Sequence, residues 1–220
     1  MLGQNKIFLV IELFLLFLLI PIGMYFLTPS RIFPALWGFA LFCWFILKRD
    51  PGFDRSYLWK SHAIAQYLKP MFIRFAIVSL FIGICVFLLA PDSLFNLIKQ
   101  RPLLWIMIVI LYPILSVYPQ ELIYRTWFFH RYHHLFPQKW VMIAINGLAF
   151  GFMHIIFQNW LAVLLTTVGG MLFAYTYQRS RSTFLVSIEH ALFGCLMFSV
   201  GLGQFFYIGA INNIPHFLKF

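Results

Sequence analysis

Residues 102–130 read PLLWIMIVILYPILSVYPQELIYRTWFFH, a run that is long and apolar enough to cross a lipid bilayer as one helix. Glu121 is its only acidic residue and Arg125 its only arginine or lysine. A charged side chain near the centre of a spanning helix costs about 2.5–3.5 kcal/mol on insertion scales, so those that occur are candidates for function. The run therefore predicts both a membrane-spanning fold and a buried polar site.

The rest of the chain has the same apolar character. Similar runs cover residues 6–27, 33–48, 71–91, 139–158, 160–178 and 183–203. Of the 220 residues, 62% are hydrophobic and 10% are charged, against roughly 45–50% and 25% in soluble domains. Such a chain has too little polar surface for a water-soluble fold. We predict an all-α, polytopic transmembrane helix bundle of about seven spans, or eight if the tail 204–220 crosses, in one domain over residues 1–220.

The net charge of +10 comes from Lys and Arg residues that lie mostly in the short segments between apolar runs. Such residues are a topology signal of membrane proteins, and no nucleic-acid partner is expected. With seven spans, most of them fall on the side of Lys6, which the positive-inside rule places in the cytoplasm. We expect a multi-pass protein of the cell membrane with a cytoplasmic N-terminus.

Residues 57–68 carry an apolar stripe among basic residues, which predicts a helix lying on the membrane surface.

Glu121 and Arg125 are four residues apart, so they share one face of the predicted helix and can pair. Pro119 has no backbone N–H to donate to the carbonyl of Leu115, which loosens the helix beside them. Taken alone, the two charges are also explained by a structural ion pair that holds helices together.

Two histidines lie inside later apolar runs. His154 follows Gly147 and Gly151 on nearly the same helix face, so another helix can approach closely there. A single histidine on such a face is more often a hydrogen-bonded core residue than a ligand, and His190 invites the same interpretation. Counted from the cytoplasmic ends of their helices, Glu121, His154 and His190 lie at depths of roughly 15, 21 and 12 Å.

These three side chains therefore reach one broad layer in the cytoplasmic half of the bundle. A carboxylate and two imidazoles can hold a Zn²⁺ ion with an open position for water, which makes Glu121, His154 and His190 candidate metal ligands. The same set can act without a metal, with the glutamate as general base and a histidine as oxyanion donor.

Other polar residues in or beside the apolar runs are assigned structural roles. His130, His133 and His134 follow the fourth run and are interpreted as solvated histidines at the membrane boundary. Arg74 lies inside the third run and is expected to reach the cytoplasmic interface or to pair within the bundle. Glu189 lies on a different helix face from the histidine beside it, which indicates a packing or supporting role.

Three short motifs then give a specific resemblance. They read Gln120-Glu121-Leu-Ile-Tyr-Arg125, Phe150-Gly-Phe-Met-His154 and His190-Ala-Leu-Phe-Gly194. Their order and spacing resemble the Glu-Glu-x-x-x-Arg, Phe-x-x-x-His and His-x-x-x-Asn motifs of the CAAX prenyl proteases and related bacteriocin-processing membrane proteins, the CPBP or Abi family. The resemblance covers roughly residues 100–203, which we take as the motif-bearing core. Residues 1–100 form the preceding helices and a cytoplasmic loop.

The resemblance implies an intramembrane endopeptidase of the CAAX-protease type. Peptide hydrolysis would use water activated by Glu121 and His154, either free or bound to a metal such as Zn²⁺. His190 would steady the developing oxyanion or the metal, and Arg125 would fix the carboxylate. The implied substrates are lipidated C-terminal tails, leader peptides or membrane-anchored precursors, reached within the lipid bilayer.

Two departures from the family's motifs leave the activity open. Gln120 stands where the family has its first glutamate, usually taken as the residue that activates water, and Gly194 stands where the family has asparagine. Because glutamine cannot act as a base, either Glu121 takes that role or the site has changed function. The alternative is an inactive member that binds a membrane partner, as immunity or scaffold proteins do. A transporter is a third reading of the buried charges, although no internal repeat supports it.

Overall fold

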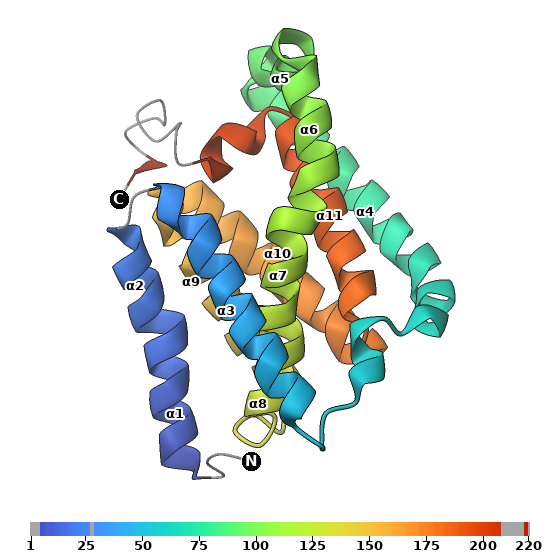
Figure 1. Ribbon diagram of the computed structural model, residues 1–220. Coiled ribbons are helices and arrows are strands. Elements are labelled where there is room, and N and C mark those ends of the chain that lie inside the picture. The colour runs from blue at the N-terminus through green and yellow to red at the C-terminus, as the bar shows by residue number, and fades with distance from the viewer. Residues whose placement is uncertain (1–4, 27–28, 208–217, 220) are drawn as a thin grey trace.

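The computed structural model is a bundle of helices (Figure 1). It describes residues 5–26, 29–207 and 218–219, without the side chains of residues 29–30 and 61–63, and contains no strand in these ranges. Within them, six helices are long and apolar enough to span a membrane, and Thr183–Ser199 is a shorter apolar helix. The all-α, polytopic fold is therefore confirmed. The cytoplasmic side of the bundle stays a prediction.

The helices follow the apolar runs along the chain. In order they are α1 (Lys6–Phe14), α2 (Ile20–Tyr25), α3 (Pro29–Arg49), α4 (Ser61–Leu89), α5 (Asn96–Gln100), α6 (Pro102–Tyr112), α7 (Tyr118–Glu121), α8 (Phe128–Tyr132), α9 (Lys139–Met153), α10 (Trp160–Ser180) and α11 (Thr183–Ser199). Short 3₁₀ turns cover Arg55–Leu58, Pro91–Ser93, His154–Phe157 and Leu202–Phe206. The segments Leu15–Leu19, Pro113–Val117 and Leu122–Trp127 are π-helical and join α1 to α2, α6 to α7 and α7 to α8. Lys6–Tyr25 and Pro102–Tyr132 are thus two continuous spans.

The surface helix predicted over residues 57–68 does not form as a separate element. Arg55–Leu58 is a single 3₁₀ turn, which begins where the side chain of Asp54 accepts a hydrogen bond from the Ser56 N–H at 2.9 Å. The next helix starts at Ser61 and runs through Leu89, so residues 61–68 lengthen the third span. The chain after the last helix begins with the 3₁₀ turn Leu202–Phe206. The prediction that the tail 204–220 could add an eighth span concerns mainly residues 208–217, which lie outside the described residues.

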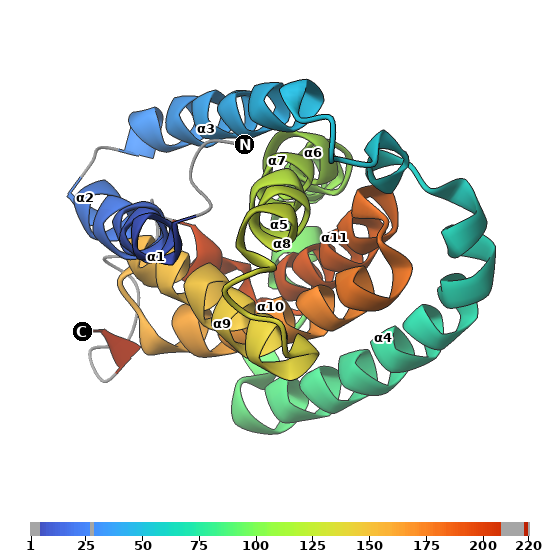
Figure 2. The same ribbon diagram turned by 90° about the horizontal axis from the view of Figure 1, so that it is seen from below.

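The centre of the bundle is formed by α7, α9, α10 and α11, with α3 and α1–α2 on one side and α4 along the other (Figure 2). Glycines permit the close approach of α9 to α10. A Cβ added at Gly147 would overlap Met171, and one added at Gly151 would overlap Thr167. The close helix contact predicted from these two glycines is confirmed, and it fixes the end of α9 that carries His154.

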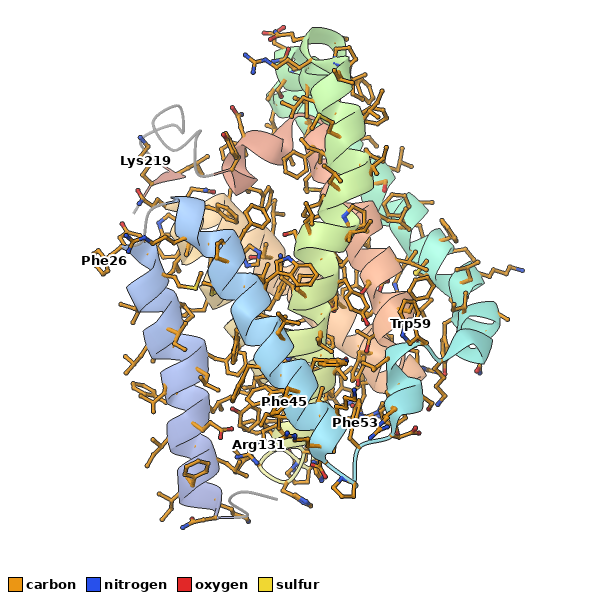
Figure 3. The ribbon with its side chains drawn as sticks, in the orientation of Figure 1. Phe26, Phe45, Phe53, Trp59, Arg131 and Lys219 are labelled. Carbon is orange, nitrogen blue, oxygen red and sulfur yellow. The ribbon has the colours of Figure 1, made fainter. Side chains whose placement is uncertain are left out.

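Ionic contacts hold the bundle together at the end where α1 begins, near the labelled Arg131 (Figure 3). Arg131 donates from Nε and Nη2 to the carboxylate of Glu12 at 2.9 and 2.8 Å, and the hydroxyl of Tyr132 donates to Glu12 at 3.0 Å. Nε2 of His130 lies 2.9 Å from Oδ2 of Asp50. This hydrogen bond is the main reason that the pKa of Asp50 is lowered below its ordinary value. These contacts tie the end of the fourth span to the first span and to the end of α3.

Candidate active site

The fourth span departs from regular α-helix where it carries the site. The segments Pro113–Val117 and Leu122–Trp127 are π-helical, and Pro119 lies between them without a backbone N–H. Trp37 of α3 donates its Nε1–H to the carbonyl of Leu115 at 2.9 Å, the carbonyl that residue 119 would bond in a regular helix. The loosening predicted at Pro119 is thus present and is stabilised by a neighbouring helix. Single turns of π-helix are frequent at functional sites because they change the direction of side chains.

Glu121 is fully buried and faces two partners. Its Oε1 lies 2.7 Å from Nδ1 of His190 on α11, and its Oε2 lies 3.1 Å from Nε of Arg125. Arg125 is also fully buried, donates from Nη2 to the carbonyl of Gly170 at 3.2 Å, and places its guanidinium over the ring of Phe150 at 4.3 Å. The predicted pairing of Glu121 with Arg125 is confirmed. Arg125 compensates the buried negative charge of Glu121, and the pairing orients the carboxylate toward α11.

His190 has a partner at each ring nitrogen. Nδ1 faces Glu121, and Nε2 lies 3.1 Å from the hydroxyl of Tyr112 on α6. With an ionised Glu121, the hydrogen of the neutral ring sits on Nδ1, so Nε2 is an acceptor. The ring of Phe173 stacks on the imidazole with the centroids 4.8 Å apart. His190 is therefore fixed in orientation, and an ionised Glu121 also fixes its tautomer.

His154 follows the last residue of α9 and contacts the ring of Phe150, as His190 does. Its Nδ1 lies 2.7 Å from the carbonyl oxygen of Phe150 and donates to it, which leaves the lone pair of Nε2 uncommitted in the neutral ring. The ring centroid of Phe150 lies 4.8 Å from that of His154 and 5.4 Å from that of His190. The two imidazoles thus pack against the same aromatic ring. Among the hydrogen bonds of the described residues, none joins His154 to Glu121.

Gln120 points elsewhere from the adjacent Glu121. Its Nε2 donates to Oγ of Ser116 at 2.8 Å, one turn earlier in the same span. Gln120 lines a cavity of about 1890 Å³, whereas Glu121 and Arg125 are not among the described residues of the cavity wall. A molecule in this cavity would meet the amide of residue 120, with the carboxylate lying behind the wall.

The wall of the cavity is apolar except in a few places. Its polar groups beside the site are contributed by Tyr112, Ser116, Gln120, His154 and His190. Leu164 and Val168 of α10 also line it, and these two apolar residues are 61% and 60% exposed. The cavity therefore extends from the two imidazoles to exposed apolar residues of α10.

The residues predicted as metal ligands do not form one donor set. The oxygens of Glu121 face His190 and Arg125, and Nδ1 of each histidine already has a partner. No group of three or more His, Cys, Asp or Glu side chains in the described ranges is placed to hold a metal ion, and this includes the exposed His133 and His134. We therefore derive no step through a metal. Zinc stays a prediction from the sequence, which metal analysis of the purified protein would test.

Comparison with known families decides the class. Residues 100–196 match the family model described as type II CAAX prenyl endopeptidase Rce1-like. Over these residues the chain is similar to the Rce1-like family. The match spans all three motifs and therefore confirms the resemblance to the CAAX-protease family on which the site was predicted. Comparisons with curated proteins and with solved structures found no match.

Other interacting residues lie outside the three motifs. Tyr112 bonds His190 from a position outside the three motifs. Arg74 pairs within the bundle, one of the two outcomes expected for it: its Nη2 donates to the buried Glu189 and to Oγ1 of Thr176, the latter at 2.9 Å. This cluster fastens α4 to α10 and α11 and supports the helix that carries His190.

The apolar composition and the family together make the chain an integral membrane protein.

Proposed function

We propose that this Rce1-like chain is an intramembrane endopeptidase whose proton transfers are carried by two imidazoles. The family match supports a CAAX-type intramembrane protease. The finer proposal is carried by one observation: the buried Glu121 is paired with His190, and the imidazole of His190 lies in the wall of a large apolar cavity.

In this proposal Glu121 acts through His190. The carboxylate accepts the Nδ1–H and would stabilise the imidazolium that forms when Nε2 takes a proton. Because the carboxylate lies behind the imidazole, it is a positioning residue and does not touch substrate. Arg125 holds the carboxylate from its other oxygen, 3.1 Å away.

The attacking water would lie between the two imidazoles. His154 accepts a hydrogen bond from it through the uncommitted Nε2, and His190 accepts its proton as the oxygen bonds to the peptide carbonyl carbon. The carbon–nitrogen bond then breaks, and the leaving amine takes the proton from His190. Gln120 cannot accept a proton, but the second hydrogen of its amide can bind a backbone carbonyl of the peptide.

The cavity indicates the substrate class. An apolar volume of about 1890 Å³ that reaches the outer face of α10 suits a lipidated or membrane-anchored peptide that enters from the bilayer. A water-soluble polar peptide would have to lose its hydration in an apolar wall, which is unfavourable.

The test is cleavage in lipid vesicles that contain the purified chain and a library of membrane-anchored peptides. The reaction is run in water enriched in oxygen-18, and mass spectrometry identifies new C-termini that carry the heavy oxygen. We expect cleavage by the native chain and a loss of at least about 100-fold in His154→Ala and in His190→Ala. His134→Ala, which changes an exposed histidine, serves as the control.

Cleavage that persists in both His154→Ala and His190→Ala would overturn the mechanism. Absence of cleavage by the native chain across the library would favour the inactive binding protein. Gln120 and the complete burial of Glu121 are the observations on which that second candidate rests.

A further inference from the structure

We propose that the hydroxyl of Tyr112 is the donor that stabilises the oxyanion, an inference that rests on the endopeptidase function proposed above. Tyr112 lies at the end of α6, outside the three motifs, and its side chain lines the cavity beside His190.

The position of the Tyr112 ring depends on Gly194. A Cβ added at Gly194 would overlap Cε1, Cζ and the hydroxyl oxygen of Tyr112. The ring can therefore lie against α11 only because residue 194 has no side chain. The ring of Phe198, one turn further along α11, packs against it with the centroids 5.9 Å apart. Gly194 thus provides the space in which a phenol from another helix meets the site.

The hydroxyl is placed on the nitrogen that the mechanism uses. Its oxygen lies 3.1 Å from Nε2 of His190, whose other nitrogen faces Glu121 at 2.7 Å. Because Nε2 is an acceptor in this tautomer, the hydroxyl of Tyr112 donates to it when no substrate is present. A phenol hydrogen rotates about its C–O bond, so it can turn from the imidazole to a carbonyl oxygen placed beside it.

This rotation links two requirements of the reaction. When the hydrogen of Tyr112 turns to the substrate carbonyl, Nε2 of His190 is released to accept a proton from water. The water oxygen bonds to the carbonyl carbon, the π electrons of the carbonyl move to its oxygen, and the resulting oxyanion accepts the hydrogen bond from Tyr112. On collapse, the electron pair re-forms the carbonyl, the carbon–nitrogen bond breaks, and the amine takes the proton from Nε2. Tyr112 keeps its own proton throughout.

Other polar groups of the site are less suited to this role. Gln120 commits one hydrogen of its Nε2 to Ser116, 2.8 Å away. The guanidinium of Arg125 is fully buried and bonded to Gly170 behind the wall. Tyr112 is the hydroxyl already in contact with His190, so a carbonyl attacked beside that ring would lie within its reach.

The test removes the hydroxyl and keeps the ring. For Tyr112→Phe in the vesicle assay, we expect kcat to fall about 100-fold with KM changed by less than about threefold, as for loss of a transition-state donor. Tyr118→Phe deletes a hydroxyl from the same span at a residue that stacks on Trp59 and is not among the described residues of the cavity wall. That control should keep native kcat. Gly194→Ala keeps the hydroxyl but displaces the ring, so its kcat should fall as well.

The outcomes separate this inference from the proposed function. Native kcat in Tyr112→Phe, together with an inactive His190→Ala, would overturn the role of Tyr112 and leave the endopeptidase standing. Native cleavage by His190→Ala would overturn the proposed imidazole mechanism, and no cleavage by the native chain would remove the proposed function itself. A rise in KM alone for Tyr112→Phe would assign the hydroxyl to substrate binding and would also overturn the donor role. Each rate is expressed per amount of monodisperse protein, so a variant that folds poorly does not count as an inactive one.

Discussion

Gln120 and Glu121 are neighbours in the sequence with different surroundings. They are about 100° apart on a helix, which sends the amide into the cavity wall and the carboxylate into the core against His190. The family pattern has a glutamate at position 120, so glutamine there removes one base from the wall. The proton acceptors that face the cavity are the imidazoles, however, and Glu121 still supports one of them. The site therefore retains the groups that our mechanism requires.

At this scale we expect Gln120→Ala to lower kcat by less than about fivefold, because it removes one bond to Ser116 and one contact to the peptide but no proton-transfer group. The vesicle assay measures this, with Gln138→Ala at an exposed position as the control. A Gln120→Ala variant as inactive as His190→Ala would show that the amide has a central role which the mechanism lacks.

Sequence reasoning predicts the motif residues better than their partners. The pairing of Glu121 with Arg125 follows from their i, i+4 spacing and is observed. Tyr112 could not be predicted in the same way. Nine residues at about 100° each place it half a turn from Glu121 on a regular helix. The π-helical segment Pro113–Val117 lies between them and changes that register, and no simple spacing rule predicts where such a segment forms.

Among the helices, close packing is clearest where α9 contacts α10. Gly147 and Gly151 indicate in the sequence that a helix approaches closely. They do not indicate which helix it is, and the structure supplies α10 through Met171 and Thr167. The surface helix expected over residues 57–68 failed because its amphipathic stripe continues directly into the apolar third span, so one long helix forms.

We expect Gly151→Ala to destabilise the protein by about 1–3 kcal/mol, because the new methyl group overlaps Thr167 and the packed helices must separate. Thermal unfolding in detergent measures the effect. Gly83→Ala is the matched control, since a Cβ at Gly83 meets nothing within 4 Å. Equal midpoints for Gly151→Ala and Gly83→Ala would show that the contact of α9 with α10 is looser than described.

On the scale of the whole molecule, the cavity and the residues that line it on α10 set the route that we propose for substrate. Composition alone predicts a membrane protein, because a chain with 62% hydrophobic and 10% charged residues cannot cover itself with polar surface. Composition does not predict that the fourth and fifth spans and α11 enclose a common cavity, since this depends on long-range packing. The access from the bilayer that we propose depends on the assembled bundle.

We expect Val168→Trp to lower kcat/KM for membrane-anchored peptides about tenfold, mainly through KM, because the indole would narrow the opening at the outer face of α10. Ile77→Trp is the control. Ile77 is 64% exposed on α4, and it is not among the described residues that line the cavity. Identical kinetics for the two variants would mean that substrate enters by another route.

The central claim is that Glu121 works through His190 as one unit, and a double-mutant cycle tests it most directly. The kcat of Glu121→Gln, His190→Ala and the double variant is measured in vesicles against the native chain. We predict that each single variant loses about 10³-fold and that the double variant loses no more than the worse of the two, as residues of one catalytic unit do. Losses that multiply in the double variant, or a Glu121→Gln variant with native kcat, would contradict the account.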